Sequence, residues 1–226
     1  MLVMCFYKVK RRIVHTYLPE INIWQKSRTE MLLLFHALTE NLVVHPIVSF
    51  ATRPMRVGEE EGREHYFITP EEAKKRLETE QILAYTKIGV TGYEYFTTLE
   101  GLKGANFYVI DPNGVNYIKE HAPNLFCRVI YISVPEKIRT ERARCRSDFE
   151  SSFCKRNDDE NAQFEAFENA GKWDLHINNV DLEDSLEQFL EFFIKDYSPD
   201  TMYLIVGRTG SGKDTIVQAV KNMLAE

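Results

Sequence analysis

A glycine-rich segment with the spacing of a phosphate-binding loop lies close to the end of this 226-residue chain. Residues 203–215, Tyr-Leu-Ile-Val-Gly-Arg-Thr-Gly-Ser-Gly-Lys-Asp-Thr, combine a short apolar run, a GxxxxGK turn and the start of a helix. The backbone N–H groups of such a turn and the amino end of the helix bind phosphate oxygens, and the lysine adds a cation. The pattern therefore predicts a nucleoside triphosphate site with these members: Gly207, Arg208, Thr209, Gly210, Ser211, Gly212, Lys213, Asp214 and Thr215.

The residue after the lysine departs from the usual pattern. Asp214 stands where a serine or threonine commonly binds Mg²⁺. A carboxylate is also a hard oxygen ligand, so Asp214 is the candidate metal ligand and Thr215 is the alternative. The competing interpretation of the whole segment is an ordinary glycine-rich turn between a strand and a helix.

The elements that must position this loop lie upstream, because the residues after Lys213 suffice for one helix only. Short apolar runs at 46–51, 106–110, 128–134 and 175–178 predict strands, and 82–98 is β-rich. Helical patterns cover 70–80, 135–170 and 182–195 and alternate with these strands. This alternation predicts an α/β fold with a parallel sheet and a β-rich insertion.

Composition narrows the class of protein. The formal net charge is −6 and the pI is near 5.6, so no basic field for nucleic acid is expected. No apolar run approaches the length of a membrane span, and the N-terminal basic cluster follows the apolar residues rather than preceding them. The four cysteines have no metal-like spacing. We therefore expect a cytoplasmic enzyme without nucleic-acid or membrane partners; the sequence predicts no oligomeric state.

A second phosphate-binding pattern occurs at residues 49–61, Ser-Phe-Ala-Thr-Arg-Pro-Met-Arg-Val-Gly-Glu-Glu-Glu. Arg53 and Arg56 flank a proline on a loop that leaves a predicted strand, which favours binding of a phosphate monoester. The segment resembles the acceptor loop of the guanylate kinase family, which reads Ser-x-x-Thr-Arg-x-x-Arg-x-Gly-Glu. The likeness continues in the family's order over most of 45–195, including Ile-Asp-Pro-Asn-Gly, an arginine-rich segment and Asn-Asn-Val-Asp-Leu.

This resemblance implies a P-loop nucleoside monophosphate kinase with a three-layer parallel sheet, a small β-rich nucleotide-binding insertion and a helical lid. The implied reaction moves the γ-phosphoryl group of ATP, with Mg²⁺, to GMP, dGMP or a related nucleoside monophosphate. The implied acceptor residues are Ser49, Arg53, Arg56, His65, Tyr66, Glu94, Tyr95, Thr97 and Asp111. The implied catalytic residues are Lys213, Arg142, Arg146 and Arg156, and Asn179 is an implied ATP contact.

Some of these assignments have alternatives. Either His65 or Tyr66 could stand for a family tyrosine, the arginine run could be a solvated helix face, and Asn179 could simply cap a strand. Ala84 occupies the position of a family glutamate that binds the guanine edge, so guanine selectivity is in doubt. Glu94 is close enough in sequence to compensate for the missing carboxylate.

The position of the phosphate loop predicts a circular permutation, because the family places this unit just before the Ser49 strand. The prediction comprises an N-terminal extension, 1–44, and a kinase-like domain, 45–226, with the acceptor region at about 49–100, the lid at about 139–160 and the P-loop at 207–214. In the rival hypothesis, 1–42 are a decayed first copy, and the terminal unit belongs to a truncated second copy or docks into a neighbouring chain. Two functional alternatives remain, a non-catalytic interaction domain and a kinase for another phosphorylated acceptor such as a sugar phosphate.

Overall fold

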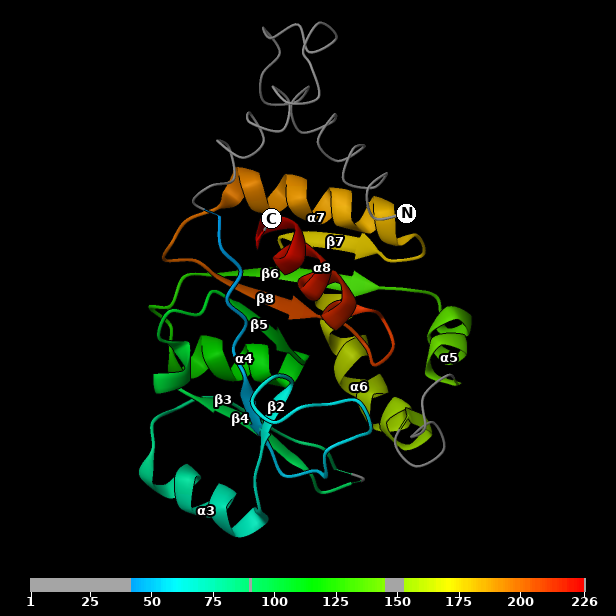
Figure 1. Ribbon diagram of the computed structural model, residues 1–226. Coiled ribbons are helices and arrows are strands. Elements are labelled where there is room, and N and C mark those ends of the chain that lie inside the picture. Colours follow the sequence, from blue (N-terminus) through cyan, green and yellow to red (C-terminus); the bar gives the residue numbers. More distant parts are fainter. Residues whose placement is uncertain (1–41, 90, 145–152, 226) are drawn as a thin grey trace, which may run out of the picture.

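The computed structural model describes residues 42–89, 91–144 and 153–225, apart from the side chains of 154–159 and 225. These residues form two four-stranded sheets (Figure 1). One sheet is parallel with the strand order β5-β8-β6-β7, and the other is mixed with the order β2-β1-β4-β3. The predicted combination of a parallel α/β sheet and a β-rich insertion is confirmed.

The parallel sheet holds the phosphate-loop strand in its interior. Its strands are β5 (Phe107–Ile110), β6 (Cys127–Ser133), β7 (Leu175–Asn178) and β8 (Met202–Val206). β8 pairs with β5 on one side and with β6 on the other, and all five of its residues are buried. This explains why the strand is apolar throughout, since helices cover both faces of a parallel sheet.

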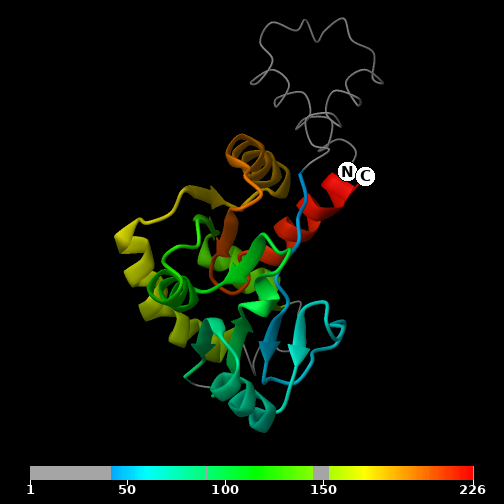
Figure 2. The same ribbon diagram turned by 90° about the vertical axis from the view of Figure 1, so that its left-hand side faces the viewer.

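Helices cover the two faces of this sheet in pairs (Figures 1 and 2). α7 (Leu182–Asp196) and α8 (Lys213–Ala225) pack on the face that buries Tyr203 and Ile205. α4 (Pro112–His121) and α6 (Cys154–Ala170) pack on the face that buries Leu204 and Val206. α5 (Glu136–Arg144) follows β6. The packed core already includes Leu42, which precedes the domain start expected at residue 45.

The mixed sheet covers the predicted acceptor region. It contains β1 (Ser49–Ala51), β2 (His65–Phe67), β3 (Ile82–Lys87) and β4 (Glu94–Thr98). α3 (Pro70–Thr79) begins with a capping box between Thr69 and Glu72, and the 3₁₀ turn η2 (Glu100–Leu102) follows β4. Side chains alternate between two faces of a strand. The pairing register puts Ser49, His65 and Tyr95 on one face, and Phe50, Tyr66 and Phe96 on the other.

No helix in the described part of the chain is long and apolar enough to cross a membrane.

Candidate active site

The glycines of the phosphate loop are required by close backbone approach. A Cβ at Gly207 would lie 2.3 Å from the carbonyl oxygen of Ile132 in β6. Gly212 has φ +89°, and a Cβ there would lie 2.4 Å from the Asn179 side-chain nitrogen. Both positions therefore exclude a side chain, which keeps the loop tight at the amino end of α8. This is the geometry in which backbone N–H groups bind a phosphate.

Lys213 lies over its own loop. Its Nζ donates hydrogen bonds to the carbonyl oxygens of Gly207 at 2.6 Å and of Arg208 at 3.2 Å. The Lys213 side chain therefore reaches from the first residue of α8 back across the loop to Gly207, which follows β8. A phosphate in the loop would meet this cation at one side, as the sequence predicts.

Asn179 and Arg142 support the loop through its backbone. Asn179 is 2% exposed, and its Nδ2 donates to the carbonyl oxygen of Ser211 at 2.7 Å. Arg142, on α5, donates to the carbonyl oxygens of Asn179 at 2.9 Å and of Ser211 at 3.4 Å. The Oδ1 atom of Asn179 is buried and has no hydrogen-bond partner within the described residues. Asn179 thus positions the loop, a role that its sequence position alone did not reveal.

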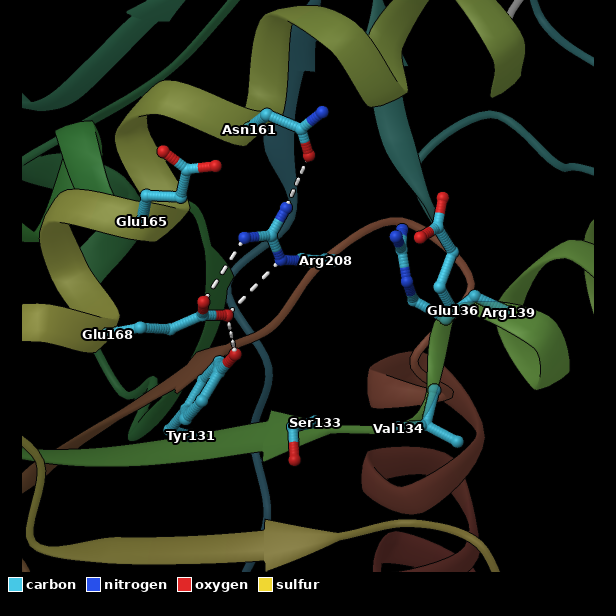
Figure 3. A pocket seen from close by; sticks show the side chains of 9 residues that line it. All are labelled: Tyr131, Ser133, Val134, Glu136, Arg139, Asn161, Glu165, Glu168 and Arg208. Carbon is cyan, nitrogen blue, oxygen red and sulfur yellow. Dashed lines mark hydrogen bonds and ion pairs between the residues drawn. The ribbon is translucent and has the colours of Figure 1, made fainter.

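Arg208 and Thr209, which follow Gly207, bind α6, and Figure 3 shows the contacts of Arg208. Arg208 donates from Nε and Nη2 to the Glu168 carboxylate, at 3.2 Å each, and from Nη1 to Asn161 at 2.7 Å. Thr209 donates from its backbone N and from Oγ1 to the Glu160 carboxylate, at 3.0 and 2.6 Å. Burial alone would raise the pKa of Glu168, but hydrogen bonds from Arg208 and Tyr131 outweigh it and hold that pKa below its ordinary value.

The predicted lid arginines are only partly described. Arg142 lies beside the loop, whereas Arg146 falls outside the described residues and Arg156 is described only as part of the α6 backbone. Arg139, which was not singled out as a site residue, is 4% exposed and donates to the carbonyl oxygen of Thr209 at 3.2 Å. Arg139 and Arg142 of this arginine run are therefore directed at the phosphate loop, whereas Arg144 is exposed on α5.

The acceptor loop is built around a buried arginine. Arg53 is 5% exposed, and its Nη1 and Nη2 atoms both donate to the Glu59 carboxylate at 2.6 Å. Glu59 also accepts from the backbone N of Arg56 at 2.8 Å, so one carboxylate holds both arginine positions. The Nε atom of Arg53 is buried without a hydrogen-bond partner within the described residues. An unpaired buried donor of this kind is what an absent anionic ligand would leave behind.

His65 lies on the same face of the mixed sheet as the arginine. Its Nδ1 is 2.9 Å from the Ser49 hydroxyl, and its ring packs edge-on against Tyr95. Burial, reinforced by the charge of Arg53, lowers the pKa of His65 to about 4, while the charges of Glu59 and Asp214 oppose the shift. The imidazole is therefore neutral near pH 7. The influence of Asp214 also indicates that the start of α8 lies close to the acceptor sheet.

Two predicted acceptor residues lie on the wrong face. Glu94 accepts from the Tyr85 hydroxyl at 2.9 Å and pairs with Lys87 at 3.4 Å. Tyr66 packs on Phe50, on the face opposite His65. Both assignments are corrected, because adjacent strand residues cannot point to the same side. Glu94 therefore does not replace the carboxylate missing at Ala84, which is buried in the apolar cluster shared with α4.

Asp111 connects the acceptor sheet to the parallel sheet. It follows β5, and the pairing of Ile110 with Val206 brings Asp111 level with Gly207, the first residue of the phosphate loop. Its Oδ1 accepts from the Thr86 hydroxyl at 2.9 Å and from the backbone N of Gly114 at 2.7 Å. Asp111 is among the predicted acceptor residues, and its contact with Thr86 of the mixed sheet fits that prediction. Thr97 is buried, and its hydroxyl has no partner within the described residues.

The residues around Asp214 suit a magnesium ion bound together with a nucleotide. Asp214 is exposed in the first turn of α8, next to Lys213. Among the described residues, no group of three or more His, Cys, Asp or Glu could hold a metal ion. Mg²⁺ in kinase sites needs only one or two protein oxygens, because substrate phosphates and water supply the rest. Asp214 is the candidate protein ligand, and Thr215, also exposed in this turn, stays the alternative.

Sequence reasoning did not find the three carboxylates that organise the site. Glu59 ends the Arg-x-Gly-Glu pattern, so its pairing with the arginines could have been inferred from that pattern. Glu160 and Glu168 are far from the phosphate loop in sequence and belong to a charge-rich helix. Nothing in their spacing distinguishes them from solvated helix positions.

Comparison with known proteins gives a consistent result. The profile of the Guanylate kinase family matches residues 27–196. A guanylate kinase of Schizosaccharomyces pombe is 28% identical over 157 residues, which cover 66% of this chain and 76% of that protein. A guanylate kinase of Pasteurella multocida is 33% identical over 101 residues, which cover 42% of this chain and 47% of that protein.

The fold has a counterpart among solved structures. The crystal structure of guanylate kinase from Anaplasma phagocytophilum matches with a TM-score of 0.50 and 21% identity, covering 74% of this chain and 83% of that one. The family match begins within the expected extension 1–44 and ends before β8. The glycine-rich loop therefore lies outside the matched segment.

Proposed function

The chain belongs to the guanylate kinase family, and on this premise we propose that it transfers the γ-phosphoryl group of ATP to GMP, dGMP or a related nucleoside monophosphate. The observation that carries the proposal is the strand order of the parallel sheet. β8 lies beside β5, so the phosphate loop and Asp111 leave the same edge of the sheet, next to the acceptor sheet. A donor loop and an acceptor cleft that share one edge can align two phosphates for transfer.

The residues have separate tasks in this reaction. Arg53 and Arg56 hold the acceptor phosphate, with the unpaired Nε of Arg53 as one donor. The loop amides bind the donor phosphates, and Lys213 exchanges its carbonyl contacts for phosphate oxygens. The attacking oxygen of the acceptor is already ionised near neutral pH, so the reaction requires no general base. Asp214 would hold Mg²⁺, which when bound would neutralise part of the charge on the donor phosphates.

We further propose that base recognition is relaxed. Ala84 cannot accept a hydrogen bond from a guanine edge, and Glu94 lies on the other face of the sheet. Phosphate recognition by the arginines does not depend on the base. The enzyme should therefore accept GMP and dGMP while discriminating less sharply against other nucleotides.

A coupled assay of ADP release tests both statements. ATP is supplied with each nucleoside monophosphate, each deoxynucleotide and a sugar phosphate in turn. Release with GMP that exceeds release with the sugar phosphate supports the proposal, and no release with any nucleotide contradicts it. An interaction domain without catalytic activity would give that second result. Strict selectivity for GMP would contradict only the proposal of relaxed base recognition and would leave the proposed kinase activity standing.

We also infer that the domain is circularly permuted and that the phosphate loop acts in its own chain. The double pairing of β8 and the burial of its residues support this arrangement. Mixing Lys213→Ala chains with Arg53→Ala chains provides the test, because each lacks a different half of the site. Recovery of activity on mixing would indicate a loop acting in a neighbouring chain, and no recovery is expected.

A further inference from the structure

We propose that Arg208 is a positioning residue that couples the phosphate loop to helix α6, whose first residues belong to the predicted lid, so that nucleotide bound in the loop changes the stability of that helix. The inference rests on the proposed function, which makes the loop the donor site. It assigns a role to a loop side chain that binds the protein rather than the nucleotide.

The first step is the face of α6 that meets the loop. Glu160, Asn161, Phe164 and Glu168 are spaced by one, three and four residues, so they lie on one side of the helix. Each of them contacts Arg208 or Thr209. This side of α6 therefore contacts the phosphate loop.

The second step is the way in which Arg208 is held. Its Nε and Nη2 atoms bind the Glu168 carboxylate, its Nη1 binds Asn161, and its guanidinium lies 5.1 Å from the centre of the Phe164 ring. Its side chain is only 16% exposed. The guanidinium of Arg208 thus donates hydrogen bonds to two residues and also lies against an aromatic ring. These contacts together fix the side chain more firmly than a single ion pair would. Tyr131 on β6 donates to the same carboxylate and joins the sheet to the cluster.

The third step concerns Thr209, which contacts both α5 and α6, the two helices that contain the ends of the predicted lid. Its N–H and hydroxyl groups bind Glu160 of α6, and its carbonyl oxygen accepts from Arg139 of α5. A cavity of about 360 Å³ separates Arg208 and Glu168 on one side from Glu136 and Arg139 on the other (Figure 3). At this cavity Thr209 of the loop connects the two helices.

The consequence follows from these contacts. A nucleotide that orders the loop also orders Arg208 and Thr209, and these residues hold the middle of α6. The amino-terminal part of the same helix carries Arg156, a predicted lid arginine. Loss of the Arg208 contacts should therefore misplace the lid relative to the donor phosphates, which lowers kcat more than it changes the KM for the acceptor.

Hydrogen exchange with and without Mg-ADP tests the coupling directly, because it requires binding but no phosphoryl transfer. In the unmodified chain, ADP should slow amide exchange both in the loop and in residues 160–170 of α6. In Arg208→Gln, the loop should still be protected while the protection of α6 is lost. Equal protection of α6 in both proteins would overturn the proposal, as would the absence of any α6 response in the unmodified chain.

A matched control is available at the other end of the sheet. Arg128 binds Asp196 through Nε and Nη2, at 2.7 and 2.9 Å, near the start of β6. Arg128→Gln removes a comparable ion pair and should leave the response of α6 to ADP unchanged. Loss of that response in the control as well would show that general destabilisation explains the effect and would overturn the proposal.

Kinetics provide the second readout. Arg208→Gln should lower kcat roughly ten- to a hundredfold with the acceptor KM nearly unchanged. Glu168→Gln tests the same contact from α6 if the loop variant does not fold, and the double variant should lose no more than either single one. Wild-type kcat in both single variants would overturn the inference. If the unmodified chain shows the α6 response but no transfer to GMP, the proposed function fails and the coupling stands.

Discussion

Lowering the pH should destabilise this protein through His65. Burial and the nearby Arg53 charge lower the pKa of the folded imidazole to about 4, from an ordinary value near 6.5. Between these two values the unfolded chain binds a proton that the folded protein does not bind. His65 therefore leaves the free energy of unfolding intact above about pH 6.5, and it lowers that free energy as the pH falls toward 4.

The size of the effect follows from the two pKa values. Between about pH 7.5 and about pH 5, this one group should reduce the free energy of unfolding by about 2 kcal/mol. The assay is urea unfolding of the unmodified chain and of His65→Gln at both pH values. The unmodified chain should lose about 2 kcal/mol more than the variant, because every other titrating group is common to the two.

His121→Gln serves as the control, since His121 is an exposed histidine on α4. It should lose the same amount of stability as the unmodified chain. If His65→Gln loses as much stability as the unmodified chain, the reasoning is refuted. Titration of the His65 ring signals by NMR provides an independent check and should give a midpoint near pH 4.

Three further substitutions test the phosphate sites. Gly212→Ala introduces a Cβ at φ +89°, 2.4 Å from the Asn179 side chain, so it should cost about 1–3 kcal/mol of stability and weaken Mg-ADP binding, measured by melting temperature and titration calorimetry. Lys213→Ala should lower kcat on the order of a hundredfold or more with little change in melting temperature, and unchanged ADP release would contradict its role. Arg53→Ala should lower kcat/KM about equally for every accepted nucleotide, whereas Arg63→Ala, at an exposed ion pair, should not.

The sequence was sufficient for the phosphate loop and its strand, because their pattern depends on local chemistry. Residues 203–206 are all apolar, as a strand buried on both faces must be, and the glycines follow directly. The contacts of Arg208 and Thr209 could not be predicted in this way. Their partners on α6 are polar residues in a polar helix, and only tertiary packing shows which side of that helix meets the loop.

The acceptor sheet shows a different kind of error. The sequence interpretation assigned both Glu94 and Tyr95 to the acceptor site, although neighbouring residues of a strand point to opposite faces. The alternation alone would have excluded one of them, and the pairing of Ala51 with Tyr95 decides which one. The same rule separates His65 from Tyr66, where the pairing with Ser49 selects the histidine.

The proposed permutation is physically plausible because strand pairing, not chain order, fixes the donor loop. β8 is held by hydrogen bonds to β5 and β6, and Gly207 approaches the end of β6 too closely for any side chain. The connection from α7 into β8 is itself fixed, since the Asp196 carbonyl oxygen accepts from the Tyr203 hydroxyl. This short, anchored connection fixes where β8 enters the sheet, and pairing with β5 and β6 then sets the register of the strand. The loop can therefore lie at the end of the chain and still meet the same two strands.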